Sequence, residues 1–193
     1  MSSNSSGKST PQTFAMLGKF CLLLLVCLSA SQSSSFRGFS RGFVRSRPRS
    51  SPGAVDARRG GSEYHYSWRH DGGRKYSGRG AQVYCSRLGP RWQPVSVETQ
   101  QESHWLNGVV SSERQQYIWT SGFRSRSAWR WASGSVVAPL NWSPTGGFRR
   151  PQPDNREGHE NCLAVLNNFY RDGIRWHDVG CNHRKPVVCE RKA

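Results

Sequence analysis

The chain has 193 residues and a formal net charge of +16 at pH 7. This length predicts one domain with tails rather than several domains, and the strong positive charge favours anionic partners. The charge is uneven, because residues 32–62 hold seven arginines against the single Asp56, whereas residues 63–193 hold nineteen basic and eleven acidic residues.

Residues 1–31 are typical of a secretory signal. Lys8 and Lys19 precede an apolar core at residues 20–28, and the small residues that follow offer a cleavage site after Ser31. A core of this length is too short for the hydrocarbon layer of a bilayer, which needs about 20 apolar residues. We therefore expect a secreted, extracellular protein with no stable membrane insertion. The alternative is a leader that is retained as a type II membrane anchor.

Residues 32–62 are rich in Ser, Arg and Gly, and three phenylalanines are spaced among Arg-Gly dipeptides. Such a composition cannot bury a core, so it predicts a disordered basic linker before a domain at residues 63–193. Arg-Gly-Phe repeats also occur in segments that bind nucleic acid. In a secreted protein the available polyanions are acidic glycans and surfaces, so we expect the linker to contact anionic surfaces and not nucleic acid. The alternative is a solvated charge run without a partner.

The sequence of the first half of the domain predicts two strands and two helices. Apolar residues recur at helical spacing from about Ser77 to Leu88, and Thr99 with Glu102 forms a capping box before a second helix that ends near Ser111. Alternating aromatic residues predict a strand at 63–68, and a short strand follows at 93–97.

The sequence of the second half of the domain predicts strands separated by long loops. A buried strand at 117–120 is expected to end at Ser121-Gly122, and further strands are expected at 163–166, 174–176 and 186–189. The tryptophans between residues 129 and 142 are expected to serve mainly as core and loop anchors.

Four cysteines remain once the leader is removed, namely Cys85, Cys162, Cys181 and Cys189. An even number in a secreted chain predicts disulfide bonds, and four cysteines allow three pairings. The residues alone do not choose among these pairings.

Oxygen-bearing side chains form two clusters close to these cysteines, with Gln152, Asp154 and Glu160 in one and Asp178 in the other. Calcium prefers six to eight oxygen ligands, mainly carboxylates and amides. Three carboxylates packed together without a cation would repel one another. A shared ion is therefore the simplest hypothesis.

These motifs resemble the second half of a C-type lectin domain. The family carries a Glu-Pro-Asn or Gln-Pro-Asp tripeptide, then a Glu beside a cysteine, then Trp-Asn-Asp before a further cysteine. The counterparts are Gln-Pro-Asp at 152–154, Glu160 before Asn161-Cys162, and Trp-His-Asp at 176–178. The resemblance covers about residues 63–191.

The resemblance implies an α+β, C-type lectin-like fold. In that fold, twisted antiparallel sheets are flanked by two helices and carry a long, loop-rich ligand region. It also implies the disulfide pairs Cys85–Cys189 and Cys162–Cys181.

The resemblance further implies calcium-dependent recognition of sugar hydroxyls on cell or microbial surfaces. Carried over by position, the calcium ligands are Gln152, Asp154, Glu160 and Asp178, with a cis peptide bond before Pro153, and the same side chains contact the sugar. The Gln-Pro-Asp order resembles that of galactose-binding members.

Two further positions enter the predicted ligand-binding set. His177 replaces the usual Asn of the third motif, and an imidazole nitrogen is a poor ligand for a cation that prefers oxygen. Trp129 is the tryptophan most suited to stacking on a sugar.

Three rival hypotheses stay open. The first is a calcium-independent adhesion protein of an extracellular matrix or cuticle, which binds polysaccharide or protein through the lectin-like fold and the basic linker. The chain looks arthropod-like, and such proteins serve innate immunity or cuticle. The second is a zinc site made of Cys162, His177, Cys181 and His183. The third is an enzyme, but the histidines and carboxylates form no nucleophile–base arrangement, so we predict no catalytic activity.

Overall fold

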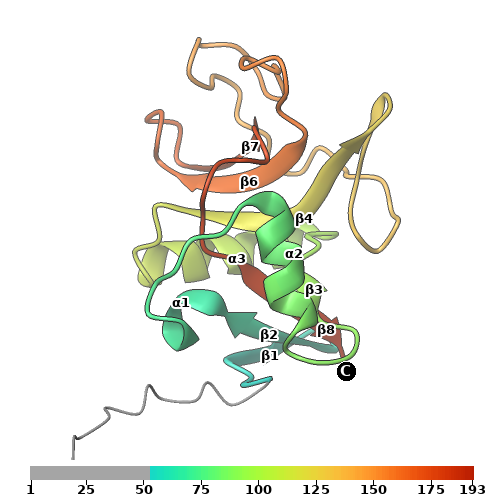
Figure 1. Ribbon diagram of the computed structural model, residues 1–193. Coiled ribbons are helices and arrows are strands. Elements are labelled where there is room, and N and C mark those ends of the chain that lie inside the picture. Colours follow the sequence, from blue (N-terminus) through green and yellow to red (C-terminus); the bar gives the residue numbers. More distant parts are fainter. Residues whose placement is uncertain (1–52) are drawn as a thin grey trace, which may run out of the picture. The chain divides into compact units, whose positions relative to one another are not determined.

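The structure is a computed structural model that describes residues 53–193 (Figure 1). The predicted leader and most of the predicted linker lie outside the described residues. The described elements, in chain order, are β1 (Ala57–Arg59), β2 (Ser62–Tyr66), α1 (Ser67–His70), α2 (Gly78–Ser86), β3 (Gln93–Pro94), α3 (Gln100–Ser112), β4 (Tyr117–Ser125), β5 (Ala128–Arg130), β6 (Cys162–Asn167), β7 (Ile174–Val179) and β8 (Val188–Lys192).

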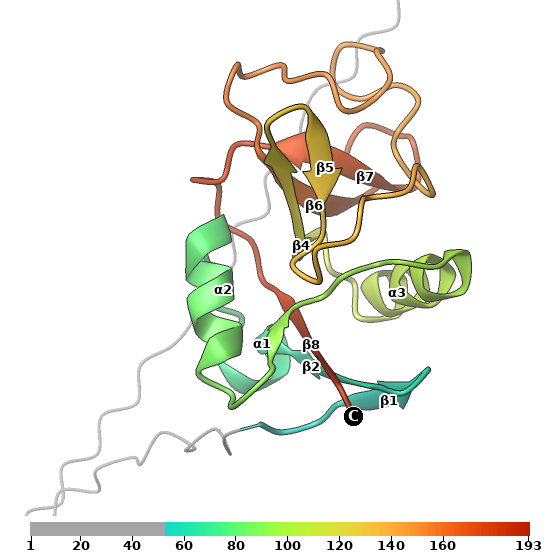
Figure 2. The ribbon, with the colours of Figure 1, turned by 90° about the vertical axis from the view of Figure 1, so that its right-hand side faces the viewer.

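The strands form two four-stranded sheets in which every pairing is antiparallel. The first sheet has the order β1-β2-β8-β3 and joins the two ends of the domain, whereas the second has the order β5-β4-β6-β7. Helices α2 and α3 lie on opposite sides of the strands, and the long loops gather beyond the second sheet (Figure 2). The predicted α+β class, the two flanking helices and the loop-rich upper half are confirmed.

Both long helices begin at a side-chain N-cap, and the cap at Thr99 was predicted. The Ser77 hydroxyl accepts from the Gly80 amide at 3.2 Å, and the Thr99 hydroxyl accepts from the Glu102 amide at 3.1 Å. The Glu102 carboxylate accepts from the amide of Glu98, not from that of Thr99. The return bond of the predicted capping box therefore goes to the residue before the N-cap, where it still satisfies a free amide.

Three predicted boundaries are wrong. Residues 57–59 pair with β2, so the folded domain begins before Glu63. The expected strand at 63–68 ends at Tyr66, and α1 follows at once. β4 continues to Ser125 through a change of register between Trp119 and Phe123.

Gly122 explains why the Ser-Gly pair did not end this strand. A Cβ at Gly122 would lie 2.7 Å from the Cβ of Leu163 on the neighbouring strand β6. A glycine is needed here for close packing of two strands, and it does not form a turn.

Both disulfides that the resemblance implied are present. Cys85–Cys189 joins α2 to β8 across 104 residues, and Cys162–Cys181 links the start of β6 to the segment after β7 across 19 residues. In the chain-entropy model these cross-links stabilise the fold by about 4 to 5 and about 3 kcal/mol respectively. The shorter link lies beside the predicted ligand loops and restricts them.

The tryptophans pack mainly in the core, as predicted. Trp119, Trp131 and Trp176 are at most 1% exposed. Trp129 and Trp142 pack against the same core, with their ring centroids 5.3 Å apart. Within residues 53–193, no helix is both long and apolar enough to cross a bilayer.

Candidate functional site

Three of the predicted donors meet above the second sheet. Asp178 lies in β7, opposite Leu163 of β6, while Asp154 and Glu160 lie in the loop that leads into β6. One carboxylate oxygen from each of the three acids lies within 4.8 Å of the others. Residues that are distant in the sequence therefore form one compact acidic group, which we call the carboxylate group.

Asp178 holds the loop in place through the backbone. Its Oδ1 accepts from the Asp154 amide at 3.1 Å, and its Oδ2 accepts from the Asn155 amide at 2.7 Å. Asn155 has a left-handed φ of 48°, and its side-chain oxygen accepts from the Glu160 amide at 3.0 Å. The side chains of Asp178 and Asn155 therefore place the two loop carboxylates.

Two oxygens of the carboxylate group have no hydrogen-bond partner. Among the residues that the structure describes, Asp154 Oδ2 and Glu160 Oε2 are both buried and unpartnered. A buried carboxylate oxygen without a donor is costly. A cation at this point would supply the missing partner, so the donor chemistry fits a hard ion such as calcium.

The charges of the group also favour a cation. Burial, together with the neighbouring carboxylates of Asp178 and Glu157, raises the pKa of Glu160 from its ordinary value to about 7. Burial likewise raises the pKa of Asp178. Both shifts mean that negative charge is hard to hold here without a positive partner.

Gln152 lies beside this group. The Gln152–Pro153 peptide bond is cis, as the resemblance implied, and Gln152 is 9% exposed. Its side chain packs against Gly146, whose φ is 53°, and it lines the same cleft as the three carboxylates. Gln152 thus lies within the predicted site, in the same cleft as the three converging carboxylates.

His177 is directed to a different partner. Its Nε2 lies 3.0 Å from Asp172 Oδ2, and both side chains are 2% exposed. Burial lowers the pKa of His177. The same Asp172 oxygen accepts from the Ser143 hydroxyl, and the Tyr170 ring packs 5.3 Å from the imidazole. His177 is therefore tied into the loop packing, and it does not join the converging oxygens.

Two other predicted sites are not assembled. Cys162 and Cys181 are joined to each other, so their sulfurs are not available as thiolate ligands, and the zinc alternative is wrong. Trp129 packs on Trp142 and the core and is not among the residues that line the cleft. Its proposed stacking on sugar has no support in this arrangement.

The carboxylate group opens into a cleft of about 180 Å³. Its other walls bring together aromatic and basic residues that were not predicted as site residues, including Tyr117, Arg156, Phe169, Tyr170, Arg184 and Lys185. These residues come from several segments and share no spacing motif. In the sequence, only the adjacent basic residues Arg184 and Lys185, close to Cys181, could have indicated that part of this cleft wall.

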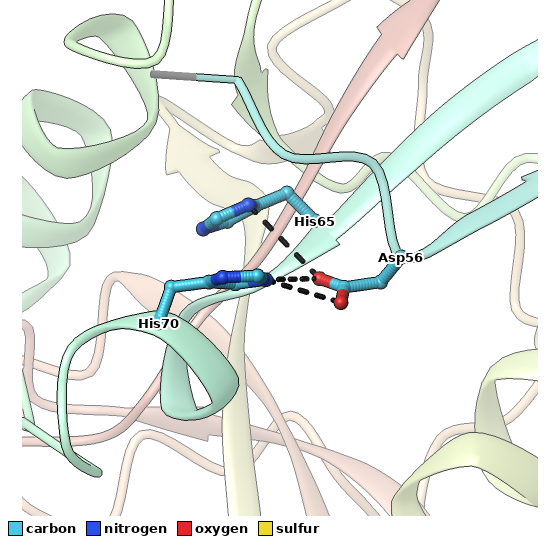
Figure 3. A group of neighbouring side chains, drawn as sticks. All are labelled: Asp56, His65 and His70. Atoms are coloured by element: carbon cyan, nitrogen blue, oxygen red, sulfur yellow. Dashed lines mark hydrogen bonds and ion pairs between the residues drawn. The ribbon is translucent and has the colours of Figure 1, made fainter. Parts of the chain in front are cut away.

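A second group of possible metal ligands, the His–Asp group, lies beside the first sheet (Figure 3). It consists of Asp56, which precedes β1, His65 of β2 and His70 of α1. His65 Nδ1 lies 2.7 Å from the Ala54 carbonyl, which can only accept, so this nitrogen carries the proton. His65 Nε2 then accepts from the Tyr84 hydroxyl at 2.8 Å. Burial lowers the pKa of His65, which favours this neutral form.

The remaining members of the His–Asp group are also satisfied. Asp56 accepts from the Tyr66 amide at 2.7 Å and from His70 Nε2 at 2.9 and 3.0 Å, and the Arg69 guanidinium lies 3.5 Å away. A cation would have to displace these donors and would meet the positive charge of Arg69. We therefore interpret the group as a structural anchor for the start of the domain.

Comparisons with known proteins agree with this fold. The model of the Lectin C-type domain family matches residues 74–191, which is more than half of the chain. A lectin of Pleurodeles waltl is 27% identical over 115 residues, covering 57% of this chain and 61% of the relative. Asialoglycoprotein receptor 2 of Rattus norvegicus is 29% identical over 129 residues, covering 58% of this chain and 39% of the relative.

A solved structure of similar shape is the Ca²⁺-independent C-type lectin SPL-2 from Saxidomus purpuratus. It has a TM-score of 0.57 and 26% identity, and the match covers 70% of this chain and 90% of that one. The chain spans about three fifths or less of the length of the two curated relatives. The family and these relatives are lectins, which agrees with the prediction that the chain is not an enzyme. The chain belongs to the C-type lectin domain family.

Proposed function

We propose that this protein is a secreted lectin that binds carbohydrate with the help of a calcium ion. The ion would be held by Asp154, Glu160 and Asp178, with Gln152 as an additional oxygen donor. When bound, calcium supplies a charge to which sugar hydroxyls coordinate. The protein supplies the oxygens that hold the ion and the cleft walls that surround the sugar.

One observation carries this proposal above the others. Asp154 Oδ2 and Glu160 Oε2 are buried side by side with Asp178 and have no donor within the described part of the chain. A carboxylate group that served only the fold would be expected to find hydrogen-bond donors, as the His–Asp group does. The unpartnered oxygens are what a cation site requires.

The proposed sugar class follows from the Gln-Pro-Asp tripeptide at residues 152–154, whose order resembles that of galactose-binding members of the family. We propose an extracellular location, with glycans of cell or microbial surfaces as targets, because the leader at residues 1–31 has the features of a secretory signal. The basic residues of the linker would add attraction to anionic surfaces.

The test is retention on galactose and mannose resins with calcium and with EDTA. We expect retention on the galactose resin with calcium and complete elution by EDTA. A matched control is Glu113→Gln, which removes a carboxylate that does not line the cleft and should leave retention unchanged. Retention that is equal in calcium and EDTA would contradict the proposed role of the ion.

A second candidate function is calcium-independent adhesion to polysaccharide or protein in a matrix or cuticle. Two observations favour it, namely the similarity to a lectin described as Ca²⁺-independent and the position of His177, which is bound to Asp172 where the family has an Asn ligand. On this hypothesis binding persists in EDTA and weakens as salt is raised, because screening reduces electrostatic attraction.

A further inference from the structure

The cleft contains a buried lysine without an acidic partner. Lys185 is 6% exposed, and its Nζ lies 4.6 Å from the centroid of the Tyr117 ring and 5.0 Å from that of Trp119. Within residues 53–193, no carboxylate oxygen lies within 4.0 Å of this ammonium group. Burial lowers the pKa of Lys185 to about 8, so the group is still largely protonated at neutral pH.

A second ammonium group meets the same tyrosine. Lys75, which is exposed, donates from Nζ to the Tyr117 hydroxyl at 2.7 Å, and its Nζ lies 4.9 Å from the ring centroid. Because the hydroxyl accepts this bond, its own proton remains for another acceptor, and the described part of the chain provides none. Tyr117 thus contacts two ammonium groups.

These positive charges are not balanced by the acids of the cleft. The carboxylate of Glu157 contributes attraction to Lys185, but it lies 2.9 and 3.0 Å from His183 Nε2 and is engaged there. The ring faces of Tyr117 and Trp119 compensate the Lys185 charge in part, through cation–π attraction. A buried ammonium group normally requires an anionic partner as well.

We propose that Lys185, Tyr117 and Lys75 form an anion-binding subsite, which takes a carboxylate or sulfate group of an acidic saccharide. This inference rests on the proposed function, because the neutral hydroxyls of the same saccharide would contact the ion held by Asp154, Glu160 and Asp178 in the same cleft. The two lysines and the tyrosine hydroxyl supply charge-assisted hydrogen bonds to the anionic oxygens. The subsite therefore favours acidic glycans over neutral ones.

The carboxylate group and the anion-binding subsite belong to one site. Lys185 and Tyr117 line the same cleft as the carboxylate group, and Tyr117 also borders the adjoining surface depression that contains Lys75. A cation held by the carboxylate group would select for hydroxyls, and the ammonium groups would select for an oxyanion. The combination distinguishes acidic from neutral sugars of the same ring type.

The experiment measures affinities of the full chain for galactose, galactose 6-sulfate and galacturonic acid, each with calcium and with EDTA. The variants are Lys185→Met and Lys75→Met, which keep most of the apolar stem and remove the charge. The control is Arg87→Gln, which removes one exposed positive charge from the end of α2, outside the cleft. Circular dichroism checks that each variant is folded.

We expect the parent chain to prefer at least one acidic sugar, and each lysine variant to lose about tenfold in affinity for it. Affinity for galactose should stay within about twofold in both variants, and Arg87→Gln should change none of the three affinities. The sulfate and carboxylate sugars show which oxyanion the subsite accepts. Should Lys185→Met not fold, Lys75→Met carries the test alone, because Lys75 is exposed.

Failure of this inference is separate from failure of the proposed function. Equal affinity of the parent chain for neutral and acidic sugars, or equal losses for both in the lysine variants, would overturn the subsite and leave calcium-dependent binding intact. Acidic-sugar binding that needs Lys185 and Lys75 but is unchanged by EDTA supports the subsite and overturns the role of calcium.

Discussion

The carboxylate group and the His–Asp group both bring together side chains that could bind a metal ion. They differ in whether these side chains already have hydrogen-bond partners. In the His–Asp group, Asp56 accepts from a backbone amide and from His70, and both nitrogens of His65 have partners. In the carboxylate group, two buried oxygens have no donor among the residues that the structure describes. Proximity of potential ligands is the same in both groups, so proximity alone does not identify a metal site.

In these two groups, hydrogen-bond satisfaction separates the structural cluster from the candidate binding site. A satisfied buried cluster stabilises the fold, and a metal ion would have to break its hydrogen bonds. An unsatisfied group of like charges raises the free energy of the ligand-free fold, and a ligand relieves that cost. Substitutions in the two groups should therefore have opposite consequences for stability and for calcium binding.

The largest expected effect is on calcium affinity. We expect Asp154→Ala to weaken calcium binding about 100-fold, or about 2.7 kcal/mol, because it removes one of the three converging carboxylates. Isothermal titration calorimetry measures this change. The free energy of unfolding in EDTA should stay the same or rise, because the substitution removes a negative charge close to Asp178 and Glu160. The control is Asp56→Ala, which should leave the calcium affinity unchanged.

Unaltered calcium uptake by Asp154→Ala would show that the ion, if any, is held elsewhere. An equal loss of calcium affinity in Asp56→Ala would show that the two groups do not differ in the way described.

A slightly smaller effect is expected on stability in the His–Asp group. We expect Asp56→Ala to lower the free energy of unfolding by about 2 kcal/mol in EDTA, because the Tyr66 amide and His70 lose their acceptor. Urea denaturation measures the change. The matched variant Asp56→Asn keeps one acceptor oxygen and should lose about half as much.

If Asp56→Ala unfolds at the same urea concentration as the parent chain, the group is not an anchor. A rise in stability on adding zinc to the parent chain in calcium-free buffer, absent from Asp56→Ala, would instead identify the group as a metal site.

The smallest expected effect is the pH dependence of the calcium-free protein. The pKa of Glu160 is about 7 in the folded chain, above its ordinary value of 4.5. The folded state therefore binds more protons than the unfolded state between these values, so the stabilising contribution is complete below about pH 4.5 and is lost as the pH rises through 7. The loss should be about 1 kcal/mol, because solvent screens part of the interaction.

Urea unfolding in EDTA at pH 5 and pH 7.5 measures this contribution. Glu160→Gln should show a flatter dependence than the parent chain, and calcium should reduce the loss of stability at pH 7.5 by neutralising the group. A parent chain that becomes more stable from pH 5 to pH 7.5 in EDTA, with Glu160→Gln showing the same slope, would exclude Glu160 as the source.

Local patterns in the sequence predicted the helices well. The helix start near Ser77 and the Thr99–Glu102 pair were predicted correctly, because a helix start depends on residues three or four positions apart. The strand ends were predicted less well. Whether Ser121-Gly122 turns or continues depends on the close packing of Gly122 against Leu163, which lies on another strand.

The same limit applies to the site. The motifs at 152–154, Glu160 and 176–178 were readable because the resemblance to a family places them in order. The partner of His177 was not readable, because pairing with Asp172 depends on the turn between β6 and β7.

The amino-acid sequence by itself determined the helix starts, because short-range spacing carries that information. It determined the class of fold and the candidate ligands through the resemblance of its motifs to a known family. Only the tertiary structure decided which polar groups were satisfied. Asp154 Oδ2 and Glu160 Oε2 are left without donors, whereas His65 has a partner on each ring nitrogen. Lys185 meets Tyr117 on a strand distant in the chain. Hydrogen-bond satisfaction and burial depend on how distant segments pack together, so no local sequence pattern predicts them.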